Sequence, residues 1–203
     1  MKTLSLFPSY VMVGRLGGAA SLNRELKREI DILAKIDAEG RAWSKTHYTG
    51  GYSSYNSMTQ LHHTSPNFGD LKDKLAPYIR KFIRQAEWDL LDRKVEMTTC
   101  WANRMGKGCH HTMHIHPLSV ISGVYFVDCP KGSSPFKIED PRMGRLMAAP
   151  PRRSNCQAKN RNYIEMQPKP GEFILFESWM KHEVPPHRST SPRLSISFNY
   201  EWS

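Results

Sequence analysis

The spacing of hydrophobic residues changes near residue 93 of this chain. Before that point, apolar side chains recur every three or four residues in two segments, which is the period of a helix buried on one face. The first segment contains Leu22, Leu26, Ile30 and Leu33, and the second contains Leu71, Leu75, Ile79, Phe82 and Ala86. Ser21 or Asn23 can cap the first helix, and Gly40 is expected to end it. The second helix is expected to begin near Asp70, and Pro77 either kinks it or marks its first turn.

After residue 93 the pattern is one of short strands separated by turns that contain glycine and proline. The predicted strands are 95–103, 120–127, 163–166, 172–176 and 193–201. Several short strands with turn signals between them are typical of a jelly roll or barrel. A length of 203 residues suits one domain. We therefore predict one α+β domain over residues 1–203, with supporting helices over about 1–92 and a jelly-roll core over about 93–203.

Composition excludes several classes of protein. Hydrophobic residues make up 39% of the chain, enough for a packed core, and no apolar stretch is long enough to span a membrane. The first apolar run is interrupted at Pro8, too early for a secretory signal. The cysteines form no C-x-x-C pair, so reduced thiols and a cytoplasmic location are expected. They are Cys100, Cys109, Cys129 and Cys156.

Positive charge is the strongest compositional signal. Lysine and arginine number 29 against 19 aspartates and glutamates, a net charge of +10. Such an excess favours anionic partners, such as nucleic acid, phosphorylated metabolites or carboxylates, although solubility alone would also explain it. The segment between Asp140 and Glu165 has no acidic residue, and we expect a loop over the barrel mouth, either a cationic lid or a solvated surface loop. Its basic residues are Arg142, Arg145, Arg152, Arg153, Lys159 and Arg161.

A cluster of histidines carries the candidate chemistry. Four of the nine histidines lie within 109–117, and His114 and His116 would point to the same face of an extended strand. Two neutral imidazoles so placed form half of a site for iron, zinc, copper or nickel. His182, which follows a Pro-Gly turn and a predicted strand, is the best candidate for the third ligand. The alternative is that these are ordinary surface or core histidines.

A second candidate group lies on the last predicted strand. Alternation places Arg193, Ser195, Ser197 and Asn199 on one face and leaves the other face apolar. An arginine facing the inside of a barrel is costly unless an anion pairs with it. Arg193 therefore predicts a bound carboxylate, to which Ser195 adds a second donor. The alternative is an edge strand whose polar face meets water.

These residues, in this order, resemble the 2-oxoglutarate/Fe(II)-dependent oxygenases, and most closely a subgroup found in bacteria and phages. The resemblance spans nearly the whole chain. It is carried by Trp101-Ala-Asn103, His114-Ile-His-Pro117, Ser122-Gly-Val-Tyr-Phe126, Glu139-Asp-Pro-Arg142, Pro170-Gly171 and Trp179…His182, with Leu6-Phe7-Pro8 and Gly50-Gly-Tyr-Ser53 nearer the N-terminus. It implies a double-stranded β-helix, the cofactors Fe(II) and 2-oxoglutarate, and hydroxylation of a substrate with release of succinate and CO₂.

The resemblance also implies roles for individual residues. His114, His116 and His182 would bind the iron, and Arg193 and Ser195 would bind the far carboxylate of 2-oxoglutarate. The substrate, small-molecule or peptidyl, is not identified by the sequence, and the positive charge favours an anionic one.

A polar contact to 2-oxoglutarate is further implied at Asn103, although an asparagine that ends a strand before Gly106 is an equal alternative. Trp101, on the same strand face, would line the pocket or belong to the core. His110 and His111 are expected to face solvent or to support the ligands rather than to bind metal.

The sequence departs from the family at one ligand. Most of the superfamily has a carboxylate where this chain has His116, so the iron site would be one negative charge short. Asp140 could supply a carboxylate from a neighbouring strand, but Asp-Pro-Arg is more simply a turn with a local ion pair.

Two other functions remain open from the sequence. One is a three-histidine metal enzyme that uses no keto acid. The other is a non-catalytic, basic, nucleic-acid-binding jelly-roll module. Nucleic acid is the less favoured partner because aromatic and basic residues interleave sparsely outside the basic loop. No membrane association is expected, and the sequence does not indicate an oligomeric state.

Overall fold

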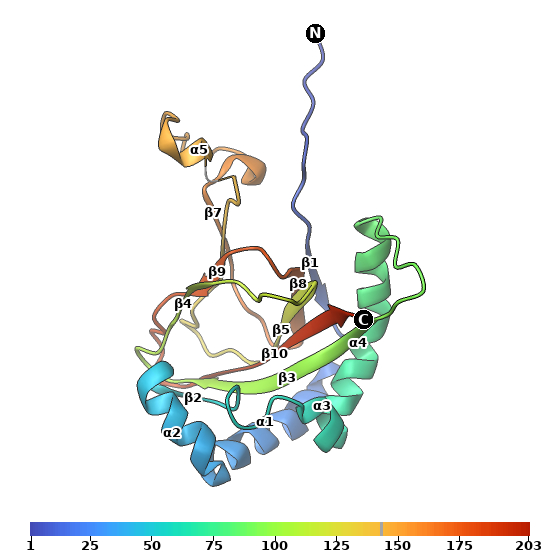
Figure 1. The fold of residues 1–203 in the computed structure, drawn as a ribbon. Coiled ribbons are helices and arrows are strands. Elements are labelled where there is room, and N and C mark those ends of the chain that lie inside the picture. The colour runs from blue at the N-terminus through green and yellow to red at the C-terminus, as the bar shows by residue number, and fades with distance from the viewer. Residues whose placement is uncertain (143) are drawn as a thin grey trace.

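A computed structural model describes residues 1–142 and 144–203 (Figure 1). Its strands are β1 (Val11–Arg15), β2 (Gly51–Ser53), β3 (Val95–Met105), β4 (His111–His114), β5 (Ile121–Asp128), β6 (Phe136–Glu139), β7 (Tyr163–Met166), β8 (Glu172–Glu177), β9 (His182–Val184) and β10 (Arg193–Trp202). Its helices are α1 (Ala19–Ile36), α2 (Ala38–His47), α3 (Leu61–Thr64), α4 (Pro66–Gln85) and α5 (Gly144–Met147), with a turn of 3-10 helix at Ala158–Asn160. None of the helices described is long and apolar enough to cross a membrane.

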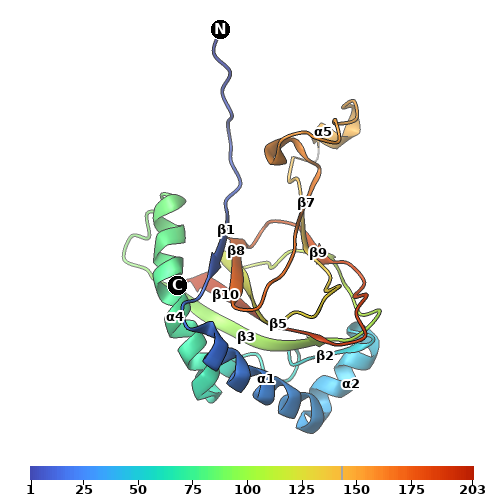
Figure 2. The same ribbon diagram turned by 180° about the vertical axis from the view of Figure 1, so that it is seen from behind.

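The strands form two antiparallel sheets. The larger has the order β1-β8-β5-β10-β3-β2, and the smaller has the order β4-β9-β6-β7. Helices α1 to α4 cover the outer face of the larger sheet, while the smaller sheet lies over its inner face (Figures 1 and 2). One apolar cluster joins the helices to the outer face, and a second fills the space between the sheets. The candidate site lies in this second space.

Alternation along β10 divides polar from apolar residues as predicted. Leu194, Ile196 and Phe198 belong to the core beneath the helices, because odd and even positions of a strand face opposite sides. Arg193 and Ser195 face the space between the sheets. The five predicted strands are all present, but β1, β2, β6 and β9 were not predicted. These strands are only three to five residues long, too short for a period of two to be recognised.

The prediction that Gly40 ends the first helix is wrong. Helix α1 ends at Ile36, and Asp37 caps a new helix in which Gly40 is an internal residue. The Asp37 carboxylate accepts the Gly40 N–H at 2.9 Å, and a Cβ at position 40 would collide with that carboxylate. Glycine is required here because the Asp37 carboxylate lies too close for a larger side chain, not because the chain reverses direction.

The helix starts also differ from the predicted ones. Helix α1 begins at Ala19, before either predicted cap. Helix α4 begins at Pro66, four residues before Asp70, and the Ser65 side chain caps its first turn. Proline is well tolerated there because the first turn has no intrahelical acceptor for its missing N–H. Pro77 lies inside α4 rather than at its start.

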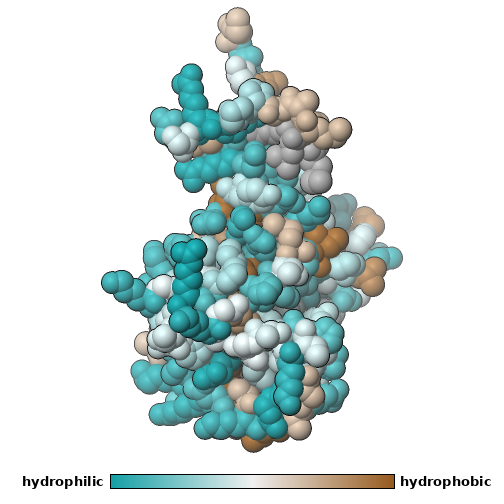
Figure 3. Space-filling view, turned by 90° about the vertical axis from the view of Figure 1, so that its left-hand side faces the viewer, coloured by the Kyte–Doolittle hydropathy of each residue, from teal (hydrophilic) through white to brown (hydrophobic). Residues whose placement is uncertain are grey.

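The basic segment does not lie over the inter-sheet cavity, contrary to the expectation of a loop over the barrel mouth. It projects beyond β6 and β7, away from the body of the molecule (Figures 1 and 3), and none of its described residues lines that cavity. The reason is the strand order, since β6 and β7 are at the opposite end of the smaller sheet from β4. The side chain of Arg145 lies outside the described part of the structure.

Candidate metal centre

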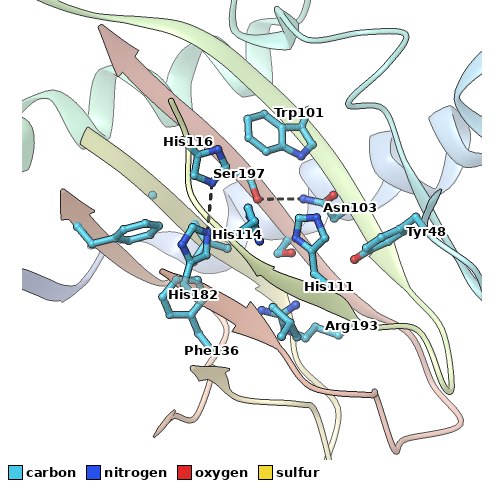
Figure 4. Close-up of a pocket in the computed structure, with 15 residues that line it drawn as sticks. Tyr48, Trp101, Asn103, His111, His114, His116, Phe136, His182, Arg193 and Ser197 are labelled. Carbon is cyan, nitrogen blue, oxygen red and sulfur yellow. Dashed lines mark hydrogen bonds between the residues drawn. The ribbon is translucent and has the colours of Figure 1, made fainter. Parts of the chain in front are cut away.

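Three histidines converge between the two sheets (Figure 4). His114 is the last residue of β4, His116 follows two residues later, and His182 is paired with His114 across the β4–β9 ladder. One ring nitrogen of each lies within 4.8 Å of the others. Among the described residues, this is the sole group of three or more histidine, cysteine or acidic side chains with the spacing of a metal site.

His116 reaches this group by a route that strand alternation does not explain. Strand β4 ends at His114, so His116 lies in the loop that follows, just before the turn at 117–118. Its backbone N–H donates to the Ser178 carbonyl oxygen at 3.0 Å, which holds this loop against the loop before β9. The predicted convergence is observed, but a contact between loops fixes His116.

Backbone carbonyls fix the tautomers of two rings. Nδ1 of His114 lies 2.7 Å from the Thr112 carbonyl oxygen. Nδ1 of His182 lies 2.9 Å from the Met180 carbonyl oxygen. A carbonyl oxygen only accepts, so each Nδ1 carries the hydrogen and each Nε2 presents a lone pair. Nε2 of His116 lies 3.2 Å from Nε2 of His182, a distance that requires a proton or a cation between them. This donor set fits a metal ion that prefers imidazole.

Burial keeps these imidazoles neutral. Desolvation, followed by the neighbouring His114, lowers the pKa of His116 to about 4. Desolvation and the surrounding histidines lower the pKa of His182 to about 2, and burial also lowers the pKa of His114. Neutral imidazole is the form that binds metal, so the rings are in the ligating state at neutral pH.

Arg193 lies at the other end of the same cavity and has no anionic partner among the described residues. The residue is only 2% exposed, and its Nε and Nη2 atoms have no hydrogen-bond partner. Its Nη1 lies 3.8 Å from the Met105 sulfur, and its guanidinium lies 5.0 Å from the centre of the Phe126 ring. Burial lowers its pKa. A buried, unpaired guanidinium is costly and fits a carboxylate ligand.

The cavity between these groups is lined by polar and apolar side chains, with no acidic residue among those described. Ser195 lines it beside Arg193. The Asn103 amide also lines it, accepting from the Ser53 hydroxyl at 2.8 Å and donating to the Ser197 hydroxyl at 3.0 Å. One amide hydrogen of Asn103 is left for a ligand. Trp101 forms part of the wall, which is one of the two positions that the sequence allowed.

His111 and Tyr48 also line the cavity, although neither was predicted to do so. His111, expected to face solvent or support the ligands, has its ring in the cavity, 4.1 Å from the His114 ring. Tyr48 approaches His111 edge-on at 6.0 Å. Tyr48 follows α2, and no local pattern in the sequence associates it with strands more than sixty residues later.

Asp140 does not belong to the group of three histidines and does not line their cavity. Its buried carboxylate accepts from Nε of Arg142 at 2.8 Å and from Nη2 at 3.0 Å. This is the turn with a local ion pair that the sequence also allowed. No described acidic residue therefore belongs to the group, which consists of three histidines.

Comparison with solved structures shows the fold. A prolyl-4-hydroxylase from Pseudomonas putida superposes with a TM-score of 0.62 at 14% identity, over 95% of this chain and 92% of that one. HygX from Streptomyces hygroscopicus, with nickel and 2-oxoglutarate bound, gives 0.63 at 11% identity, over 95% and 83%. A prolyl hydroxylase from Trichoplax adhaerens, in complex with a hypoxia inducible factor peptide fragment, gives 0.61 at 13% identity, over 94% and 83%. The predicted α+β jelly roll is confirmed.

Comparison with protein families identifies the family that part of the chain resembles. A search of curated proteins found no match. Residues 99–199 match the model of the family described as "Putative 2OG-Fe(II) oxygenase". This segment extends from β3 to β10 and includes the three converging histidines and Arg193. In this segment and in its fold, the chain is similar to the 2-oxoglutarate/Fe(II)-dependent oxygenases.

Proposed function

We propose that this chain hydroxylates a substrate in a reaction that consumes O₂ and 2-oxoglutarate and releases succinate and CO₂. One observation carries the proposal: a single cavity contains three neutral imidazoles at one end and a buried, unpaired guanidinium at the other. When bound, Fe(II) and the keto acid together supply the O₂ chemistry that no amino-acid side chain provides.

His114, His116 and His182 would hold the iron. The fixed tautomers of His114 and His182 support this, since both Nε2 lone pairs are directed inward before any metal binds. Three neutral ligands provide one negative charge fewer than the carboxylate-containing triad of most relatives. A dianionic keto acid would compensate for that missing charge. Each of the two, the metal and 2-oxoglutarate, would therefore bind more tightly when the other is present.

Arg193 and Ser195 would bind the far carboxylate of 2-oxoglutarate. The guanidinium offers a planar fork that matches a carboxylate, and its two unpartnered nitrogens are Nε and Nη2. Asn103 would donate its remaining amide hydrogen to the same ligand. A keto acid in this position would displace water from the guanidinium and pair the buried charge.

The substrate would be a small molecule or a peptidyl group with anionic character. The described cavity lining has an arginine and four histidines but no carboxylate, so it does not repel an anion. Among the structural neighbours, HygX has hygromycin B bound in one structure, and the Trichoplax enzyme has a peptide fragment. We place the protein in the cytoplasm, where its four free cysteines would stay reduced.

An anaerobic Fe(II) titration, with and without 2-oxoglutarate, tests the proposal. We expect one Fe(II) per chain and a new metal-to-ligand charge-transfer band when the keto acid is added. A succinate assay over a panel of metabolites and peptides then identifies the substrate. Binding of iron without any spectral response to 2-oxoglutarate would instead favour a three-histidine enzyme that uses no keto acid, which His116 in place of a carboxylate also allows.

A further inference from the structure

A second cavity, of about 1000 Å³, lies at the other end of the sheets. We call it the edge groove. It is lined by residues 3–9 of the N-terminal arm, by residues 138–142 and 157–161 of the β6–β7 connection, and by Val11, Ile164, Met166 and Met180. It shares no described lining residue with the metal-centre cavity. The arm and the β6–β7 connection rise from the same end of the molecule in Figures 1 and 2.

The groove lies between the free edges of two sheets. Strand β1 is the last strand of the larger sheet, and β7 is the last strand of the smaller one. Each has a neighbour on one side alone, so the backbone N–H and C=O groups of its other side pair with none of the described strands. Such edges accept an added extended strand from another chain.

The floor of the groove is apolar. Ile138 and Met180 are buried, and Val11 and Met166 pack partly exposed against the inter-sheet core. Ile164 is half-buried beside them. Alternate side chains of an extended strand point to one side, so every second residue of a bound strand could contact this floor.

The rim of the groove is positive. Lys159 donates to the Ser5 hydroxyl at 3.3 Å and Arg161 to the Cys156 carbonyl at 3.4 Å, and neither forms an ion pair with a described carboxylate. The two acidic residues that line the groove are already engaged. Asp140 binds Arg142, and Glu139 accepts from the Tyr163 hydroxyl at 3.2 Å.

The surroundings of the groove add to this charge. The upper part of the molecule in Figure 3, to which the basic segment belongs, is hydrophilic on one side and tan on the other. Arg152 and Arg153 belong to the same segment but do not line the groove. The field around the groove therefore attracts anions, and the two unpaired rim cations would contact them directly.

We propose that the edge groove binds an extended, acidic segment of another polypeptide. Acidic side chains of the bound strand would contact Lys159 and Arg161, and the alternate apolar side chains would rest on the floor. Strand addition needs backbone amides, which a polypeptide has and a nucleic acid lacks. The aromatic side chains that stack bases are also missing, because Phe7 is the sole aromatic residue in the described lining.

This inference goes beyond the proposed function. The groove lies outside the metal-centre cavity, so a docked segment would recruit or orient a partner without contacting the reacting atoms. Its binding can be measured on protein without metal or keto acid. Failure of the iron and 2-oxoglutarate experiments would therefore leave this test intact, and the reverse also holds.

The test uses the full chain and a fluorescein-labelled peptide of alternating glutamate and valine, followed by anisotropy. The variant Lys159→Glu/Arg161→Glu reverses the rim, and Arg152→Glu/Arg153→Glu makes the same change in charge outside the groove. We expect the rim variant to weaken the Kd by about tenfold or more, with a much smaller effect in the control. Amide hydrogen exchange in β7 should slow when the peptide binds, as an added strand requires.

Several outcomes would overturn the proposal. Equal weakening in both double variants would mean that the peptide responds to the basic segment as a whole. Tighter binding of a single-stranded oligothymidine of equal charge would assign the surface to nucleic acid. Absence of measurable peptide binding, or binding without protection of β7, would remove the strand-addition site. Unchanged thermal unfolding and circular dichroism of both variants establish that the fold is intact, and Lys159→Gln/Arg161→Gln should give an intermediate Kd.

Discussion

Arg193→Leu should weaken the binding of 2-oxoglutarate and at the same time stabilise the ligand-free protein, so it tests the proposed role of Arg193 by two independent measurements. The guanidinium is 2% exposed and two of its nitrogens are unpaired, so the ligand-free protein contains an uncompensated buried charge. Removing it should stabilise the ligand-free fold by on the order of 1 kcal/mol. Removing it from the complex leaves a buried carboxylate unpaired, which costs roughly 3–5 kcal/mol. Affinity for 2-oxoglutarate should therefore fall by a factor on the order of hundreds or more.

The assay is the charge-transfer band of the anaerobic Fe(II) protein, titrated with 2-oxoglutarate, together with thermal unfolding of the protein without ligand. Fe(II) affinity should be nearly unchanged. Arg193→Lys keeps the charge but loses the fork, so its 2-oxoglutarate affinity should lie between the two. Arg152→Ala and Arg153→Ala, in the exposed basic segment, should give small effects that salt reduces. A normal titration in Arg193→Leu, with loss in the segment variants, would refute the assignment of the anchor.

Three further predictions concern the metal and the fold. His182→Ala should lose most of its Fe(II) affinity, whereas the exposed His110→Ala should keep it; wild-type binding in His182→Ala would exclude the triad. His116→Asp should keep iron and His116→Leu should not, and equal occupancy in both would place His116 outside the ligand set. Asp37→Asn should destabilise the protein by about 1–3 kcal/mol at pH 7, as measured by urea unfolding. Burial raises the pKa of Asp37, but hydrogen bonds from Ser57, Gly40 and Tyr52 outweigh it and hold the pKa below 3.8. This stability is present above about pH 4 and lost as the pH falls through the lowered folded-state pKa, so the difference between wild type and variant should shrink on acidification; a constant difference would contradict the charged role.

The elements that could be predicted are those in which a regular hydrophobic pattern continues over many residues. Helix α4 and strand β10 each place their apolar residues on one face over ten or more residues, and both were recognised. The Asp37 cap was missed because Gly40 is a common helix terminator, and the competing close contact is visible only in three dimensions. The direction of the basic segment depends on strand order, which no local pattern encodes.

The candidate site divides in the same way. His114 and Arg193 could be identified because each lies on a strand whose alternation fixes its face. The position of His116 depends on a backbone hydrogen bond to Ser178, sixty-two residues later. The sequence predicted the correct direction of this side chain from strand alternation, although His116 lies outside the strand. Tyr48 could not be identified because its contact with the cavity is made entirely through tertiary packing.

The position of β10 in the larger sheet has a consequence for synthesis of the chain. This strand comes after all the others in sequence, yet it lies between β3 and β5 and pairs with both (Figure 1). While the chain is being made, β3 and β5 therefore expose unpaired edges until β10 emerges about ninety residues after β3. Unpaired edges are where nascent sheets associate with other chains. Protection of β3 and β5 by chaperones should matter most in that interval, and slowing translation just before Arg193 should lower the soluble yield.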